Sequence, residues 1–168
     1  VGALDDLKNK LQNVPVFISK RDSRLLAGDT SLDTTEPATP IRGGVPKNIK
    51  TTPDILLNDG DHIGSLLAIA TPGHTPGSMS FLDTRSKVMI AGDAFQTRGG
   101  FAVAGQLRPL FPFPAMATWN KEISIESAKK IREHAPTTLA IGHGRMISLV
   151  GNEMDRVIKK AEANLERK

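Results

Sequence analysis

Three short segments constrain this chain more than any other feature, because each ends an apolar run with one potential metal ligand beside glycine. The segments are residues 71–78, 91–93 and 141–144, and their ligands are His74, Asp93 and His143. A strand end holds a side chain against a rigid core, and an adjacent glycine lets the backbone turn tightly. Imidazole and carboxylate bind divalent metals. The segments therefore indicate either one shared metal or catalytic site or three unrelated turn residues.

The order of apolar runs and turn residues predicts a single domain over residues 1–168. Helical spacing of apolar residues predicts helices over 4–11, 121–134 and from about 152 to the end. Strands are expected at 16–19, 55–58, 65–70, 77–83, 88–91 and 138–141, in an antiparallel or mixed sheet with one buried face. The Asp-Gly-Asp sequence at 59–61 predicts a hairpin. Residues 22–53 contain four prolines and predict a long loop or insertion.

Composition excludes several classes of protein. The chain has no cysteine, which excludes disulfides and cysteine-ligated zinc and is typical of the cytoplasm. No apolar run approaches the roughly 18 residues of a transmembrane helix. The net charge of +4 is dispersed and there is no tyrosine, so the interleaved basic and aromatic residues that bind nucleic acid are missing. We therefore expect a cytoplasmic protein that acts on a small-molecule substrate, without nucleic acid or membrane as a partner.

The other two histidines lack the context of the three segments. His62 adjoins the predicted turn at 59–61 and is expected to be exposed. His134 falls in the last turn of a predicted helix, where a partly positive imidazole complements the helix dipole. Neither is expected to bind a metal.

Taken in order, the three segments resemble the metallo-β-lactamase fold superfamily. The sequence Gly-His-Thr-Pro-Gly-Ser at 73–78 is the most specific motif, and a strand ending in Gly-Asp, a helix and a strand ending in Gly-His-Gly follow it. The resemblance implies an α/β (α+β) fold, namely an αββα sandwich. It also implies a hydrolase with two metal ions, usually zinc, along the sheet edges.

The resemblance assigns a role to each ligand. His74 would bind the first metal ion, His143 the second, and Asp93 would bridge both and so take part directly in catalysis. A hydroxide held between the ions would attack an ester, thioester, lactone, amide or phosphoester. Two cations about 3.5–4 Å apart lower the pKa of bound water and neutralise the developing oxyanion.

The family's first motif, His-x-His-x-Asp-His, does not occur in this sequence. The chain opens with Val1-Gly2-Ala3-Leu4 and leads straight into a helix, which resembles the segment directly after that motif. We therefore expect residues 1–168 to be the C-terminal part of a longer hydrolase, without its N-terminal sheet and helices. Each metal ion would have only two protein ligands here instead of three or four. The part alone is expected to bind zinc weakly, to be inactive, and to associate through its uncovered sheet face, as a homodimer or with the missing piece.

The apolar stretch 95–119 has two interpretations. Residues 110–116 could line a pocket for an acyl or other apolar group, with Arg98 and Arg108 placed to meet an anion. Alternatively, the stretch packs in the core and the two arginines are solvated.

Two further functions stay open beside the leading one, a metal-dependent hydrolase. One is a nuclease of the same superfamily, which the dispersed charge disfavours. The other is a degenerate member that has lost its metal site and serves as a binding or interaction module. The sequence upstream of Val1 would distinguish the module from the hydrolase.

Overall fold

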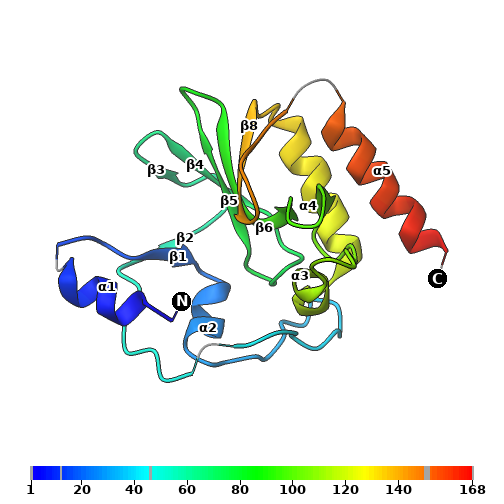
Figure 1. The fold of residues 1–168 in the computed structure, drawn as a ribbon. Coiled ribbons are helices and arrows are strands. Elements are labelled where there is room, and N and C mark those ends of the chain that lie inside the picture. Colours follow the sequence, from blue (N-terminus) through cyan, green and yellow to red (C-terminus); the bar gives the residue numbers. More distant parts are fainter. Residues whose placement is uncertain (1, 12, 46, 150–151, 168) are drawn as a thin grey trace.

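Most of the chain forms one mixed sheet with two long helices against it (Figure 1). The computed structural model describes residues 2–11, 13–45, 47–149 and 152–167, so Val1 and Pro46 lie outside the described residues. The spatial order of the strands is β3-β4-β5-β6-β8-β9, and β7 also pairs with β6. The strands are β3 (His62–Ile63), β4 (Leu66–Ala70), β5 (Met79–Asp83), β6 (Val88–Gln96), β7 (Ala102–Val103), β8 (Thr138–His143) and β9 (Ile147–Ser148).

The direction of the strands confirms the predicted mixed sheet. Strands β6 and β8 are parallel, whereas β3, β4, β5 and β6 pair with one another in antiparallel succession. A parallel pair requires a crossover connection, and helix α4 (Lys121–Glu133) lies within the crossover between β6 and β8. The ends of β6 and β8 therefore lie at the same edge of the sheet.

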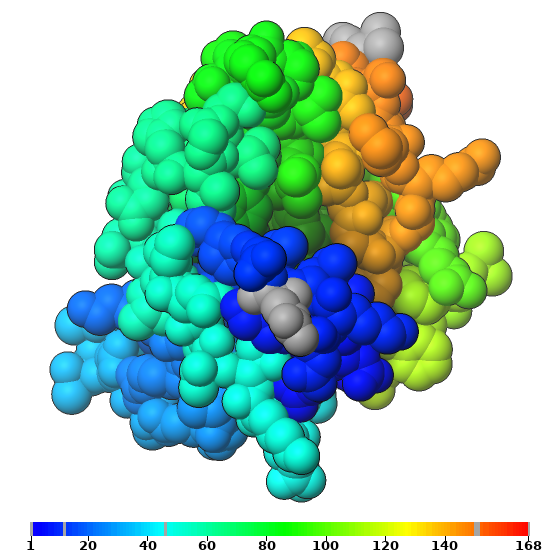
Figure 2. All heavy atoms as spheres, turned by 90° about the vertical axis from the view of Figure 1, so that its left-hand side faces the viewer, coloured from blue at the N-terminus to red at the C-terminus, as the bar shows by residue number. Residues whose placement is uncertain are grey.

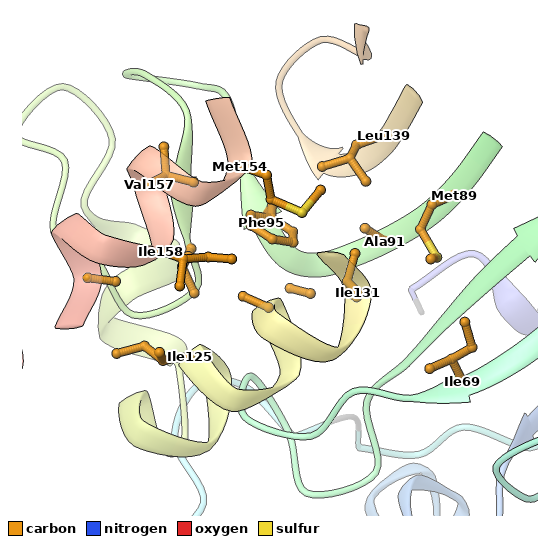
Figure 3. Packing of buried hydrophobic residues seen from close by; sticks show 14 of the residues in the cluster. Ile69, Met89, Ala91, Phe95, Ile125, Ile131, Leu139, Met154, Val157 and Ile158 are labelled. Atoms are coloured by element: carbon orange, nitrogen blue, oxygen red, sulfur yellow. The ribbon is translucent and has the colours of Figure 1, made fainter. Parts of the chain in front are cut away.

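The main core lies between the sheet and the helices α4 and α5 (Glu153–Glu166), as Figure 3 shows. From the sheet, Met89, Phe95 and Leu139 are at most 1% exposed, and Ile131 of α4 and Ile158 of α5 pack against them. Full burial of a side chain of this size contributes about 1.5–3 kcal/mol. The strands that carry Asp93 and His143 are thus backed by this buried core.

A second, small sheet is also present. It differs from the expectation that the N-terminal sheet of the fold would be missing from residues 1–168. Strands β1 (Phe17–Ser19) and β2 (Ile55–Leu57) pair in parallel. Helices α1 (Leu4–Lys10) and α2 (Asp22–Leu26) accompany them, and the whole unit lies below the main sheet in Figure 1. Figure 2 shows a hollow between the blue N-terminal residues, the green strands and the orange β8 segment.

The hairpin predicted around residues 59–61 is wrong, because β2 pairs with β1 and not with β4. The turn itself forms: the Asp61 carboxylate accepts a 2.7 Å hydrogen bond from the Asn58 N–H. Asp59 accepts a 2.6 Å hydrogen bond from the Ala70 N–H. These contacts join the small sheet to the large one, and the hairpin that leads into β4 begins at β3 instead.

Two segments expected to be irregular contain short elements. Residues 22–53 begin with α2, and the described residues after it, 27–45 and 47–53, form neither helix nor strand. Residues 95–119 contain the end of β6, the strand β7 and helix α3 (Phe113–Ala117). Within the described ranges, no helix is long and apolar enough to cross a membrane.

Candidate metal centre

The structure brings His74, Asp93 and His143 together. His74 Nε2 lies 3.6 Å from Asp93 Oδ2, and His143 Nε2 lies 3.5 Å from Asp93 Oδ1. The two oxygens of one carboxylate therefore face two different imidazoles. The side chains of His74, Asp93 and His143 are 19%, 32% and 42% exposed, so the cluster opens to solvent on the His143 side.

The loop that carries His74, between β4 and β5, is held by the start of α4. The Asn120 N–H donates to the Gly73 carbonyl at 2.9 Å, and the Trp119 N–H donates to the His74 carbonyl at 3.0 Å. Gly73 has a φ of 136°, and a Cβ at this position would lie 2.6 Å from Ser124 Cα. Only glycine permits both the backbone conformation and this approach of the helix. The motif at 73–78 is thus explained by packing as well as by chemistry.

Thr118 lies beside His74 and favours the tautomer with the proton on Nδ1. Thr118 Oγ1 donates its single proton to the Pro114 carbonyl at 2.7 Å, and it lies 3.5 Å from His74 Nδ1. The hydroxyl can therefore only accept from Nδ1–H, which leaves the lone pair on Nε2 directed toward Asp93. Burial lowers the pKa of the His74 imidazole, and the negative charge of Asp93 opposes this shift. Burial thus favours the neutral form of His74, the form that binds a metal.

A distortion of β6 places Asp93. The pairing of β6 with β8 shifts register on both sides of Gly92, which has a φ of 50°. Such bulges redirect a side chain next to a site. Asp93 Oδ1 is buried and accepts no hydrogen bond from any described residue. A Cβ at Gly142 would lie 2.3 Å from this oxygen, so glycine at position 142 creates the space for the carboxylate.

His143, the last residue of β8, is fixed by the segment that follows β6. Its carbonyl accepts hydrogen bonds from the Thr97 N–H at 3.0 Å and the Arg98 N–H at 3.2 Å. A Cβ at Gly144 would lie 2.2 Å from Thr97 Oγ1. The imidazole packs against the Phe111 ring, with 5.5 Å between the ring centroids.

The spacing of the cluster fits part of a metal site. Two ligands that each lie about 2.0–2.1 Å from a tetrahedral zinc ion are about 3.3–3.4 Å apart, close to the 3.5 and 3.6 Å found here. A metal would also give the buried Asp93 Oδ1 the partner it lacks. Within the described part of the chain, no group of three or more His, Cys, Asp or Glu side chains is arranged to hold a metal by itself. Each of two ions would therefore be bound by one imidazole and one oxygen of the Asp93 carboxylate.

The positions of the remaining two histidines agree with the prediction of an exposed His62 and of His134 at a helix end. His62 is exposed on β3, and His134 is the C-cap of α4.

Sequence reasoning missed Asp22, the first residue of α2. Asp22 Oδ1 accepts a 2.8 Å hydrogen bond from the Gly77 N–H, and Oδ2 accepts one from the Thr75 hydroxyl. Both partners belong to the loop of His74 but lie more than fifty residues away in sequence. No local pattern could have indicated this contact, because an aspartate at the start of a helix is ordinary.

Relatives of this chain are known. It is 58% identical over 162 residues to the "Uncharacterized protein YobT" of Bacillus subtilis (strain 168), an alignment that covers 96% of this chain and 70% of that protein. It is 29% identical over 159 residues to the "Probable metallo-hydrolase YflN" of the same organism, with coverages of 86% and 60%. The chain therefore spans about two thirds of the length of these two relatives.

Solved structures have the same fold. The B3 metallo-beta-lactamase BLEG-1 is 23% identical, with a TM-score of 0.61 over 93% of this chain and 69% of that one. TTHA1623, in a di-iron-bound form, is 21% identical, with a TM-score of 0.59 over 88% of this chain and 66% of that one. The family model of the metallo-beta-lactamase superfamily matches residues 1–143. With this match over most of its length, the chain belongs to the metallo-beta-lactamase superfamily.

Proposed function

We propose that residues 1–168 form part of a metal-dependent hydrolase that uses two zinc ions to cleave an ester, thioester or lactone. The observation that carries the proposal is the Asp93 carboxylate, whose two oxygens face His74 and His143 and whose buried Oδ1 has no described partner. The name of the relative YflN, a probable metallo-hydrolase, supports the reaction class. The di-iron form of TTHA1623 supports a site for two ions of some kind.

Each residue of the cluster has a distinct task in this proposal. His74 and His143 would each bind one ion through a ring nitrogen, and Asp93 would offer one oxygen to each ion. When bound, the ions supply a water of lowered pKa and positive charge for the developing oxyanion. Thr118 keeps the His74 ring in the correct tautomer, and Gly142 leaves room for the carboxylate.

The proposal includes ligands from outside residues 1–168. Three side chains give each ion two protein donors, whereas zinc sites have three or four. We therefore expect the full-length protein to be active and residues 1–168 alone to be inactive.

The test uses the full-length protein, its metal content and a panel of esters, thioesters and lactones. The wild type is expected to carry two metal ions and to hydrolyse at least one class. The His143→Gln and Asp93→Asn variants should lose metal and activity, because each removes a charge or a lone pair from the ligand set. The Gly142→Ala variant should do the same while leaving all three ligands in place, because its Cβ displaces Asp93.

Two exposed positions provide matched controls. His62→Gln removes a histidine outside the cluster, and Gly44→Ala adds a Cβ that meets nothing within 4 Å. Both should keep wild-type metal content and rate. A full-length wild type with no bound metal and no hydrolysis would refute the proposal and favour a non-catalytic binding module.

A further inference from the structure

Two segments beside the metal centre carry positive charge without any negative charge. Residues 94–120 contain Arg98 and Arg108, residues 135–152 contain Arg145, and neither segment contains aspartate or glutamate. Arg108 is engaged locally, since its guanidinium donates a 2.5 Å hydrogen bond to the Phe101 carbonyl. Arg98 and Arg145 are exposed and form no ion pair with any described residue. The charges of Arg98 and Arg145 are therefore not neutralised by a carboxylate of any described residue.

The backbone fixes both arginines next to His143. The Arg98 N–H donates to the His143 carbonyl at 3.2 Å. Thr97 Oγ1 donates to the Arg145 carbonyl at 2.9 Å and accepts from the Arg145 N–H at 2.8 Å. The two segments are thus fastened to each other at the position of a proposed ligand. In Figure 2 the yellow-green and orange segments project on the same side of the molecule.

An aromatic row leads outward from His143. The Phe111 ring lies 5.5 Å from the imidazole, and the Phe113 ring lies 5.9 Å from Phe111. The Arg98 guanidinium carbon lies 4.4 Å above the centroid of Phe111, a cation–π arrangement that holds the charge beside the row. A molecule whose reactive group lies at His143 would therefore contact the rings of Phe111 and Phe113, with the positive charge of Arg98 beside them.

Several apolar side chains of these segments are exposed, although others, such as Phe95 and Leu139, belong to the core. Leu110 is 88% exposed, Phe113 69%, and Leu107, Met116 and Met146 are 64–65% exposed. Single exposed apolar side chains are common, but Phe113 extends the ring contacts of His143 and Phe111 toward solvent. Within residues 110–116, Leu110, Phe113 and Met116 are therefore not packed in the core. Pro114 and Ala115 are buried.

We propose that this surface is a subsite for substrates that combine an apolar chain with an anionic group, a carboxylate or a phosphate. The apolar chain lies along Phe111 and Phe113, and Arg98, with Arg145 nearby, binds the anion. The proposal rests on the proposed function for the reaction itself. In that reaction one water is consumed, its oxygen forms the new bond to the acyl carbon, the bond from that carbon to the ester oxygen breaks, and the leaving oxygen takes a proton.

The test compares two substrates of equal length on the full-length protein. One is the para-nitrophenyl ester of octanoate, which is neutral, and the other is the mono-para-nitrophenyl ester of octanedioate, which ends in a carboxylate. The Arg98→Gln variant should lower kcat/KM for the anionic ester about tenfold, the size expected for one charge-assisted contact, and leave the neutral ester within about twofold. The Phe113→Ala variant should lower kcat/KM for both esters. Arg85→Gln, at an exposed turn before β6, is the charge control and should change neither.

A binding measurement separates this proposal from the proposed function. Anilinonaphthalene sulfonate is apolar and anionic, and N-phenyl-naphthylamine is its uncharged counterpart. Arg98→Gln should weaken binding of the sulfonate alone, and Phe113→Ala should weaken binding of both probes, at unchanged thermal stability. If the variants follow this pattern but no ester, thioester or lactone is cleaved, the subsite stands and the hydrolase fails. If the wild type cleaves both esters equally and Arg98→Gln changes neither kinetics nor binding, the subsite is refuted and the hydrolase stands.

Discussion

The main-chain N–H of Gly77 donates a 2.8 Å hydrogen bond to the carboxylate of Asp22, which joins the small N-terminal sheet unit to the loop of His74. The same carboxylate accepts from the Thr75 hydroxyl, next to His74 in the chain. Burial raises the pKa of Asp22, and its hydrogen bonds partly offset that shift. Asp22 thus holds the loop of His74 in position, and its negative charge also acts on the His74 imidazole.

Closing the space at Gly77 should disrupt this junction. A Cβ at Gly77 would lie 2.4 Å from the Asp22 nitrogen and 2.7 Å from Ser19 Oγ. We expect Gly77→Ala to reduce the free energy of unfolding by about 1–3 kcal/mol, the usual cost of overpacking. Gly44→Ala, which meets nothing within 4 Å, is the control and should stay near the wild type. Urea unfolding of all three proteins measures the difference, and equal midpoints would contradict the described approach of Asp22.

The ion pair of Arg21 with Glu36 should give stability that depends on pH. Glu36 accepts hydrogen bonds of 2.6 and 2.8 Å from the Arg21 guanidinium, which lowers the pKa of Glu36 below its ordinary value of 4.5. The pair is therefore fully stabilising above that value, and its contribution is lost as the pH falls through the lowered pKa. Glu36→Gln should cost about 1 kcal/mol at pH 7, and its difference from the wild type should vanish in acid.

Thermal unfolding from about pH 7 down to about pH 3 measures this dependence. The exposed Glu133→Gln is the control. A difference between Glu36→Gln and the wild type that stays constant with pH would show that Glu36 contributes packing instead of charge.

Thr118 should affect metal affinity through the tautomer of His74. The Thr118→Val variant keeps the shape of the side chain but loses the acceptor for Nδ1–H. We expect about a tenfold loss of zinc affinity in the full-length protein, the lower end for groups that orient a ligand. Thr118→Ser retains the hydroxyl and should restore the affinity. Competition with a chelating dye measures this, and a Thr118→Val affinity equal to that of the wild type would contradict the role of the hydroxyl.

Residues 1–168 produced alone should associate. Ile55 and Leu56 of β2 are 43% and 47% exposed, and β2 belongs to a sheet of only two strands. Exposed apolar edge strands promote pairing between chains. Sedimentation velocity should show a dimer for the wild type, and Leu56→Lys should shift it to a monomer. A wild-type monomer at micromolar concentration would contradict the expected association.

The sequence predicted the parts of the fold that depend on local pattern. The predicted helix over 121–134 corresponds to α4. Asn120 defines its start, because its side chain accepts a hydrogen bond from the Ile123 N–H. The sequence grouped His74, Asp93 and His143 as three strand ends, whereas in the structure Asp93 lies within β6 and His74 lies in the loop after β4. Their role as metal ligands stays a prediction.

The features that sequence reasoning missed depend on contacts between distant segments. The turn at 59–61 has residues typical of a hairpin, but β2 pairs with β1 and not with β4. Helix α3 was missed because Pro112 and Pro114 resemble a loop, although proline is tolerated in the first turn of a helix. Strand β6 is longer than predicted, since Gly92 bends the strand without ending it.

The segment from Arg98 to Thr118 is tethered at both ends to the loops that carry His143 and His74. At one end the Arg98 N–H holds the His143 carbonyl, and at the other the Trp119 N–H holds the His74 carbonyl. Between these anchors the segment contains buried side chains, such as Val103, and exposed ones, such as Phe113. The exposed positions can therefore be substituted at little cost in stability, while the two anchored carbonyls keep the loops of His143 and His74 in place.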